Sequence, residues 1–365
     1  MNVKFTDLYK IIHDKKKILS KIKQLIKNSN FVGGYEVKNF ERNFSKFTRS
    51  KYTVSLANGT DALEIAIKSL NIKKNYEVII PVNTWISTAE AILNNNLKIV
   101  FCDVNLDDYS ICLKDLKRKI NKKTRLIIPV HLYGNPTNIL KIKKIIGIRN
   151  IKIVEDCAQA HGSKINGKHV GTFGDIGTFS FFPGKNLGAF GDAGAIITNS
   201  KKIYNKSLRL RNHGAKLKYD HKFSGRNSRL DTIQAAVLNI KLKNYNSVVT
   251  KRNKLADLYF KNLSKINNIK LYQLGKKNVS CFHQFVIRVS PKNREQLRKF
   301  LQRKKIQTMI HYPYMLNELN FFPKTKNLTK SARLGKKIIS LPISEEHSEK
   351  EIYFVIKKIK EFFKH

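Results

Sequence analysis

The sequence has little cysteine, little acid and no long apolar run. The four cysteines show no CxxC or other metal-ligand spacing; they are Cys102, Cys112, Cys157 and Cys281. Four free thiols predict a reduced, cytoplasmic protein, and their spacing predicts no metal site. No stretch of about 18 uncharged apolar residues occurs, so we expect no membrane span. Residues 1–27 contain many lysines but no apolar core followed by small residues, which argues against a signal peptide.

Acidic residues are far outnumbered by basic ones. Asp and Glu number 26 against 71 Lys and Arg, which gives a net charge of +45. A field of this sign attracts polyanions. The lysines, however, are spread over the whole chain beside many Asn and Ile residues, and no RNP, zinc-finger or helix-turn-helix signature accompanies them. We therefore expect no dedicated nucleic-acid partner, although the field would attract an anionic nucleotide-linked substrate.

Strand-like and helix-like segments alternate through the first half of the chain. The pattern predicts strands at 52–57, 77–81, 98–102, 125–130 and 151–155, and helices at 62–70, 87–94 and 138–146. This alternation predicts an α/β fold with a mostly parallel sheet covered on both faces.

The second half predicts a different organisation. Strands are expected at 193–198, 281–289 and 306–310, and helices at 294–303 and 349–363. A long, largely helical segment at 230–262 is expected to link two domains. A chain of 365 residues fits one large and one smaller domain. We place the large domain at 1–245 and a small C-terminal α+β domain at 246–365.

One lysine stands in a setting unlike that of the others. Lys185 follows a strand-like apolar run and precedes a glycine-rich turn, within residues 180–189. Upstream, Asp156 follows the strand predicted at 151–155. A lysine amine forms a Schiff base with the aldehyde of pyridoxal phosphate, and a carboxylate keeps the pyridine nitrogen protonated. Burial would lower the pKa of such a lysine and free its amine. These two residues predict a pyridoxal 5'-phosphate enzyme.

Two other strand ends carry candidate cofactor contacts. Gly59-Thr60-Asp61 lies between a strand and a helix, where glycine permits a tight turn and the following amides and the Thr60 hydroxyl can hold a phosphate. The same residues also fit an ordinary turn and helix cap. Trp85, the only tryptophan, either stacks on a flat cofactor ring or lies in the core.

The segment around Asp156 supports the same interpretation. Ala158 is small enough to lie flat under a ring, and Gln159 can donate to a phenolate oxygen. Asp156 alternatively caps a helix. Glu155 is the rival carboxylate, although strand alternation points the two in opposite directions. His161 either packs behind Asp156 or tunes its charge.

Taken together, these motifs resemble the DegT/DnrJ/StrS family of sugar-nucleotide aminotransferases over nearly the whole chain. The matching segments are 33–37, 58–63, 81–88, 129–134, 155–162, 174–175, 180–194, 225–231 and 234–236. The resemblance implies a fold-type I pyridoxal-phosphate-dependent transferase that works as a homodimer, with active sites at the subunit interface. It implies Lys185 as the Schiff-base residue and Asp156 as the partner of the pyridine nitrogen.

The resemblance also implies the remaining cofactor contacts. Besides Lys185 and Asp156, they are Gly59, Thr60, Asp61, Trp85, Ala158, Gln159, Ser180 and Asn227. Trp85 and Ala158 would stack on opposite ring faces, with Gln159 near the phenolate. Gly59, Thr60 and Ser180 would hold the phosphate, and Asn227 would reach it from the other subunit.

The substrate side of the site is less completely matched. His311-Tyr312-Pro313 looks like the family's substrate-loop segment, and Tyr35 lies in the first matching segment. A second histidine often found a few residues further on is Asn317 in this chain. We expect Tyr35, His311 and Tyr312 to contact the substrate.

The reaction that the resemblance implies is amino transfer to a nucleotide-linked 3-keto or 4-keto deoxyhexose. L-glutamate is the expected donor, and the pathway is assembly of an amino sugar for a surface polysaccharide. One alternative is an idle family member with a regulatory or binding role. The other is a sugar dehydratase, but the family's dehydratases carry histidine in place of the lysine, so Lys185 favours amino transfer.

Overall fold

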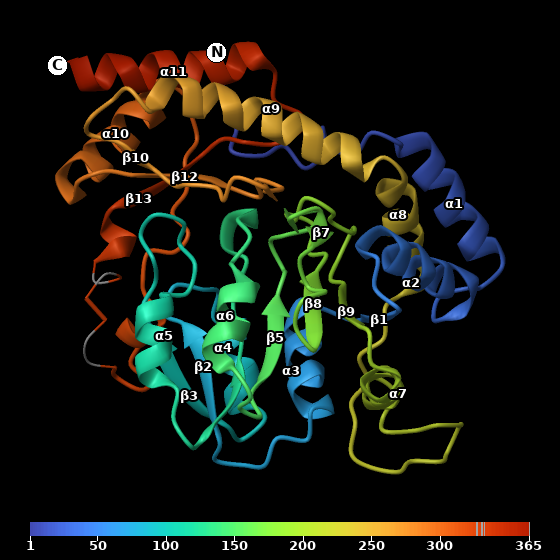
Figure 1. Cartoon of the computed structure of the whole chain (residues 1–365). Coiled ribbons are helices and arrows are strands. Elements are labelled where there is room, and N and C mark those ends of the chain that lie inside the picture. The colour runs from blue at the N-terminus through green and yellow to red at the C-terminus, as the bar shows by residue number, and fades with distance from the viewer. Residues whose placement is uncertain (326–327, 330, 332, 365) are drawn as a thin grey trace.

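A seven-stranded sheet forms the centre of the molecule (Figure 1). The computed structural model describes residues 1–325, 328–329, 331 and 333–364. The strands of the central sheet are β1 (Tyr52–Leu56), β2 (Glu77–Pro81), β3 (Lys98–Cys102), β4 (Thr124–Ile127), β5 (Lys152–Asp156), β8 (Ile176–Ser180) and β9 (Gly194–Thr198). Their spatial order is β1-β9-β8-β5-β4-β2-β3, and every strand except β9 runs in the same direction. The predicted α/β fold with a mostly parallel sheet is confirmed.

Both faces of this sheet carry apolar side chains. Successive residues of a strand point to opposite sides, so a continuous apolar strand supplies side chains to both faces. In β2, Val78 and Ile80 pack into one core and Ile79 packs into the other. The helices on one face are α3 (Gly59–Ser69), α4 (Ser87–Leu93) and α7 (Lys201–Leu210). Those on the other face are α2 (Gly34–Thr48), α5 (Leu113–Lys119), α6 (Ile139–Ile146) and α8 (Thr232–Lys243). A sheet buried on both faces requires the near-continuous apolar strands that the sequence contains.

The C-terminal part forms a smaller α+β unit at one end of the molecule. Figure 1 shows α9 (Tyr245–Leu263) lying along α11 (Glu349–Lys364), which also pack together. Beside them lie α10 (Pro291–Arg303) and an antiparallel sheet. The strands of this sheet are β10 (Lys270–Leu271), β12 (Phe285–Arg288) and β13 (Ile338–Leu341). Arg252 of α9 and Glu345 form a buried ion pair of 2.8 Å, which ties α9 to the C-terminal segment. The domain boundary at residue 245 falls at the start of α9 and stays a prediction.

Several elements differ from the sequence-based prediction. The helical segment at 230–262 is two helices, α8 and α9, which are separated at Asn244. Residues 306–310 form isolated bridges rather than a strand, with Ile306 opposite Val3 and Met309 opposite Ser340. Helices α2 and α5 and strand β10 are not predicted by the pattern. The same is true of α1 (Lys15–Lys27), β6 (Lys164–Ile165), β7 (Lys168–His169), β11 (Asn278–Val279), and the 3-10 turns η1 (Leu132–Gly134), η2 (Leu316–Glu318) and η3 (Leu334–Lys336). Among the described residues, no helix combines the length and the apolarity needed to cross a bilayer.

Candidate active site

Neighbouring parallel strands bring Lys185 and Asp156 to the same edge of the sheet. Asp156 is the last residue of β5 and pairs with Thr178 of β8. Ser180 ends β8, and the tight turn that follows carries Lys185, whose backbone N–H donates to the Phe182 carbonyl at 2.8 Å. The charges of Lys185 and Asp156 are close enough to influence each other's pKa. The carboxyl ends of parallel strands are where α/β sheets bind ligands.

The Lys185 amine lies in an environment that favours its neutral form. Burial lowers the pKa of Lys185 to about 8, because an ammonium group loses its hydration there. The negative charge of Asp156 and the thiol of Cys281 act in the opposite direction but only in part offset burial. The fraction of free, nucleophilic amine near neutral pH is therefore far larger for Lys185 than for an ordinary surface lysine.

The Asp156 carboxylate is buried and is held by neutral donors. Thr88 Oγ1 donates to Oδ2 at 2.9 Å, and the Ala158 N–H donates to Oδ1 at 3.1 Å. Thr84 and Thr88 share a hydrogen bond of 2.9 Å between their hydroxyls, which orients Thr88. Burial raises the pKa of Asp156, and these bonds and Lys185 offset that effect only in part. A cation placed beside this carboxylate would therefore stabilise its ionised form.

Glu155 faces the other side of the sheet, as strand alternation predicts. Its oxygens accept N–H groups of Gly171, Phe173 and Gly174 at 2.6 to 2.8 Å, and lie 3.0 Å from His131 Nε2. Burial raises the pKa of Glu155, but these bonds outweigh it and hold the pKa below its ordinary value. Glu155 therefore fixes the segment 171–174 and leaves Asp156 as the carboxylate beside Lys185.

Glu155 and His131 also lie beside Cys157, and this is the one group of possible metal ligands found in the described part of the chain. The Thr137 N–H donates to His131 Nδ1 at 3.0 Å, so Nε2 carries the proton and donates to Glu155. Both ring nitrogens are thus engaged. The arrangement fits a structural hydrogen-bond network and leaves His131 no lone pair for a metal.

The predicted phosphate residues gather where α3 begins. Gly59 is the first residue of α3, and a Cβ atom built on it would lie 2.6 Å from the Cβ of Ser180, so only glycine fits. Thr60 Oγ1 donates to Ser87 Oγ at 2.8 Å. Three hydroxyls and the helix N-terminus thus converge on one place, which is an arrangement that binds phosphate. Ser87, at the start of α4, adds a hydroxyl that the motif analysis does not assign.

Asp61 and Asn227 are engaged differently from the other predicted cofactor residues. The Asp61 carboxylate forms an ion pair with Arg226, and its N–H donates to Asn58 Oδ1 at 2.8 Å as part of the helix cap. Asn227 is exposed and bridges to Asn212. Within the described residues of one chain, no hydrogen bond links Asn227 to the phosphate residues. Its predicted role depends on a second subunit.

The predicted ring contacts form a second cluster. Trp85 is 56% exposed, so it is not a core residue, and its ring lies 5.4 Å from that of Tyr312. Gln159 Nε2 donates to the Tyr312 hydroxyl at 2.8 Å, while Gln159 Oε1 accepts the Tyr133 N–H at 2.7 Å. Ala158 is half-buried beside Gln159. Trp85, Ala158 and Gln159 are therefore close to Asp156 and to one predicted substrate residue.

The other two predicted substrate residues lie in different settings. His311 Nδ1 is 2.9 Å from Ser340 Oγ, and the His311 carbonyl accepts a hydrogen bond from the Tyr133 hydroxyl. Burial, followed by the charge of Lys185, lowers the pKa of His311 to about 4. Tyr35, at the start of α2, is 70% exposed, and no contact joins it to His311 or Lys185 in the described chain.

His161 and His283 are two further buried histidines, and both have a lowered pKa. The His161 ring packs 5.5 Å from Phe179 and 5.2 Å from Phe181, and burial lowers its pKa to about 3. His161 is therefore a neutral packing residue. Burial, followed by the charge of Lys185, lowers the pKa of His283 well below its ordinary value. The sequence analysis does not identify His283, because nothing near it in the sequence marks it.

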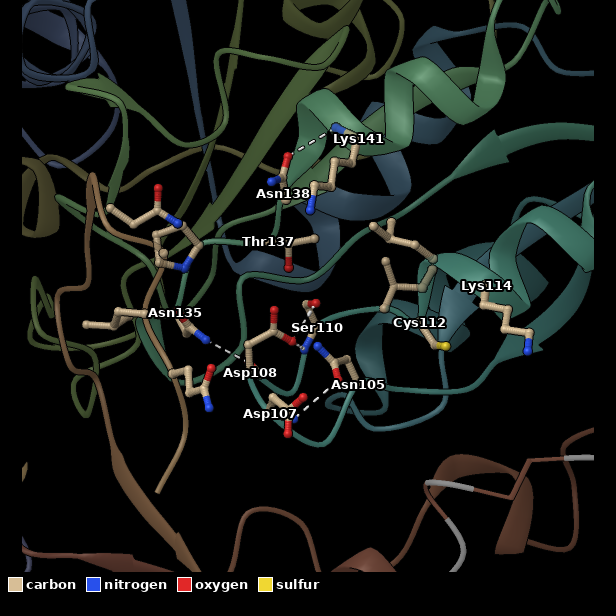
Figure 2. Close-up of a pocket in the computed structure, with 17 residues that line it drawn as sticks. Asn105, Asp107, Asp108, Ser110, Cys112, Lys114, Asn135, Thr137, Asn138 and Lys141 are labelled. Atoms are coloured by element: carbon tan, nitrogen blue, oxygen red, sulfur yellow. Dashed lines mark hydrogen bonds between the residues drawn. The ribbon is translucent and has the colours of Figure 1, made fainter. Parts of the chain in front are cut away.

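A separate pocket of about 490 Å³ opens between the loops that follow β3, η1 and β10 (Figure 2). None of the predicted site residues lines it. Its polar groups bond one another: Asp108 Oδ1 accepts the Ser110 N–H at 2.9 Å, and Asn138 Oδ1 accepts the Lys141 N–H at 3.0 Å. These bonds shape the loops, and the pocket takes no part in the site around Lys185.

Comparison with known proteins agrees with this geometry. Residues 13–360 match the DegT/DnrJ/EryC1/StrS aminotransferase family. The chain belongs to this family. A dTDP-3-amino-3,6-dideoxy-alpha-D-galactopyranose transaminase of Aneurinibacillus thermoaerophilus is 36% identical over 363 residues, or 99% of each chain. A pleiotropic regulatory protein of Geobacillus stearothermophilus is also 36% identical, over 100% of each chain. The crystal structure of DesV from S. venezuelae is 30% identical with a TM-score of 0.96, over 100% of this chain and 99% of that one.

The family's aminotransferases depend on pyridoxal phosphate, and the residues of this chain fit that cofactor. Lys185 has a lowered pKa. The buried carboxylate of Asp156 is held by neutral hydrogen-bond donors. A Cβ atom on Gly59 would clash with Ser180, so only glycine lets these two candidate phosphate contacts lie together. The chain is thus a pyridoxal-phosphate-dependent aminotransferase by family and by the composition of its site.

Proposed function

We propose that this chain transfers an amino group from L-glutamate to the keto carbon of a nucleotide-linked deoxysugar. The observation that carries the proposal is that Lys185, in the turn after β8, lies within electrostatic influence of Asp156 at the end of the neighbouring strand β5. Relatives named for dTDP-, GDP- and UDP-linked amino sugars support the substrate class. Because those relatives differ in nucleotide and sugar, the proposal covers both 3-keto and 4-keto acceptors.

Lys185 is proposed to hold the cofactor and to move a proton. When bound, pyridoxal phosphate supplies an electron-withdrawing ring that stabilises negative charge at the α-carbon of the amino donor. The amino donor would displace Lys185 Nζ from the cofactor. Lys185 Nζ would then take the proton from that α-carbon and deliver it to the cofactor carbon that receives the amino group. A pKa of about 8 suits this role, since a general base works best near the ambient pH.

Asp156 is proposed to keep a proton on the pyridine nitrogen. Its carboxylate is buried with only neutral hydrogen-bond donors, and its raised pKa shows that its ionised form is under-stabilised. A protonated ring nitrogen would supply the missing positive charge. The pair would in turn stabilise negative charge delocalised into the ring during proton transfer.

The other predicted contacts divide between the phosphate and the ring. Gly59, Thr60 and Ser180 are proposed to bind the phosphate at the N-terminus of α3. Trp85 and Ala158 are proposed to enclose the ring. The Gln159 amide nitrogen donates one N–H to Tyr312, and its second N–H is available for the phenolate oxygen. His311, Tyr312 and Tyr35 are proposed to contact the sugar nucleotide.

We further propose that the active unit is a homodimer with shared sites. Several large apolar side chains near Asn227 are exposed in the single chain, and a partner subunit would cover them. They are Phe31, Val32, Tyr35, Leu217 and Tyr219. Mixing Lys185→Ala with Asn227→Ala subunits tests the sharing. If Asn227 acts on the partner's cofactor, the mixed dimer contains one unaltered site and regains activity that neither parent has. Mixed dimers that regain nothing would contradict a shared site.

A panel of keto-sugar nucleotides assayed with glutamate tests the reaction itself. The expected product is an amino sugar nucleotide, detected by mass spectrometry, together with 2-oxoglutarate. The coloured holoprotein should change its visible spectrum when glutamate is added. A protein that binds the cofactor but shows no spectral change with glutamate or any other amino acid would contradict amino transfer.

A regulatory or binding role is the second candidate, favoured by the 36% identical relative that is named a pleiotropic regulatory protein. The same spectral test distinguishes it, because such a role needs no response to glutamate. A cytoplasmic location is proposed on the four unbonded, buried cysteines. Supply of an amino sugar to a surface polysaccharide is proposed from the substrate class.

A further inference from the structure

The residue after Lys185 is tied by its side chain to the segment before β12. Asn186 is buried, and its Nδ2 donates to the Cys281 carbonyl at 2.9 Å. Its Oδ1 lies 3.0 Å from His283 Nδ1. An amide oxygen can only accept a hydrogen bond, so His283 Nδ1 carries the proton and Nε2 does not. The two bonds fix the orientation of the amide and the tautomer of the imidazole together.

The segment that receives Asn186 is itself held at several points. Arg252 donates to the Phe282 carbonyl at 2.9 Å, and the Cys281 N–H donates to Ser163 Oγ at 3.0 Å. Asn253 Nδ2 donates to the Ser280 carbonyl at 2.8 Å. Residues 280–283 therefore present a fixed surface to Asn186, and a bond to that surface restrains the neighbouring lysine.

We propose that Asn186 and His283 form a positioning pair that holds Lys185 in its buried place, with His283 acting through Asn186. The inference rests on the proposed role of Lys185. The turn around Lys185 otherwise relies on backbone bonds, including Lys185 N–H to the Phe182 carbonyl and Ala189 N–H to the Phe181 carbonyl. Backbone turns of this kind set the path of the chain, whereas the Asn186 side chain anchors it to a separate part of the fold.

The charges around the pair keep the imidazole neutral. Burial is the largest cause that lowers the pKa of His283, and the charges of Lys185 and Arg252 lower it further. The neighbouring imidazoles of His311 and His161 have lowered pKa values of their own, so they stay neutral near neutral pH. A neutral ring donates to Asn186 without adding a positive charge beside the lysine. Around Lys185, burial lowers the pKa, whereas Asp156 and Cys281 raise it. Displacing Lys185 toward water would therefore raise its pKa toward the ordinary value, because burial is the largest influence.

The test measures the titration of Lys185 in the cofactor-free protein. Trace acetic anhydride is applied over a range of pH, and acetylation of the Lys185 peptide is followed by mass spectrometry. We expect a midpoint near 8 in the unaltered protein. In Asn186→Ala and His283→Ala it should rise by roughly one pH unit or more, because a turn released from its anchor lets water solvate the ammonium form of Lys185, which burial disfavours in the unaltered protein. His283→Asn keeps an N–H donor near the Nδ1 position and should keep the midpoint.

A matched control separates this effect from general loosening. Asn253→Ala removes a bond to the same segment but does not touch Asn186, so it should lower thermal stability while leaving the Lys185 midpoint unchanged. In the loaded enzyme, Asn186→Ala and His283→Ala should each lower kcat by at least about 10-fold with little change in the KM for the keto sugar, since small displacements of a reacting group are costly. The double variant should be no slower than the slower single one.

The outcomes distinguish this inference from the proposed function. If Lys185 of the unaltered protein titrates like the exposed lysines, its proposed role is wrong. If its midpoint is near 8 but both alanine variants keep that value, the positioning pair is wrong and the role of Lys185 stands. Should His283→Ala fail to fold, His283→Gln replaces it, since its amide reaches the Nε2 position rather than Nδ1 and should raise the midpoint.

Discussion

Asp156→Asn removes one negative charge from the site while keeping the size of the side chain. The remaining amide oxygen can still accept the Ala158 N–H, which now bonds Oδ1 at 3.1 Å. Thr88 can turn its hydroxyl to accept from the new amide nitrogen, because it already shares a bond with Thr84. The hydrogen bonds are thus preserved, so we expect folding and cofactor binding to persist.

The loss of charge alone should slow the reaction by about 100-fold or more. Removing a single electrostatic partner of a developing charge costs about 2.7–4 kcal/mol in other active sites. Two unit charges about 4 Å apart interact with about 4 kcal/mol at an effective dielectric constant of about 20, which is of the same size. Asp156 is also the main influence that raises the pKa of Lys185, so in the variant that pKa should fall below about 8.

Stopped-flow measurement of the glutamate half-reaction gives the rate, and the acetylation midpoint of Lys185 gives its pKa. Glu155→Gln is the matched control on the opposite face of the strand. In that variant the NH2 group of the new amide would face N–H groups that now donate to Glu155, so donors would face donors. The free energy of unfolding should therefore fall by about 2–4 kcal/mol, with little loss of rate in the folded protein. Full activity in Asp156→Asn would remove Asp156 from the mechanism.

Three further changes test other parts of the site. Lys185→Ala should abolish the visible absorbance of the holoprotein and its turnover, and normal transamination in that variant would refute the assignment. Trp85→Ala should weaken cofactor retention in dialysis by up to about 10-fold, because the loss of one stacked ring removes about 0.5–1.5 kcal/mol, and unchanged retention would show that the exposed indole does not touch the cofactor. Stability should fall as the pH drops from about 6.5 toward 3, since the unfolded chain takes up a proton on His161 that the native state, with its pKa of about 3, does not. His161→Leu should make that decline shallower by up to about 1.4 kcal/mol per pH unit in chemical denaturation, and an unchanged slope would place the proton uptake elsewhere.

Local pattern predicts the central sheet well. The predicted strands at 77–81 and 98–102 match β2 and β3 residue for residue. They are short apolar runs bounded by turn residues, and burial on both faces requires such runs. The two-residue strands β6, β7, β10 and β11 are not predicted, because segments of that length carry no periodicity.

Contacts between distant segments are not predictable in the same way. Thr88 and Asp156 are 68 residues apart, and Asn186 and His283 are 97 apart. The local sequence leaves Trp85 open between the core and a cofactor ring, and only the structure shows that its side chain is 56% exposed. Whether an aromatic side chain is covered depends on what the rest of the chain places above it, and that is a property of the tertiary structure.

The sequence by itself predicts which residues form the proposed centre. A lysine between an apolar strand and a glycine-rich turn, with an aspartate at the end of another strand, predicts the proposed reactive pair because the local pattern of strands and turns marks both positions. The tertiary structure alone decides how strongly those groups are tuned. Burial of Lys185, the neutral donors on Asp156 and the anchoring of Asn186 arise from packing between segments far apart in the chain, and the electrostatic environment of a buried group depends on all of its neighbours in space.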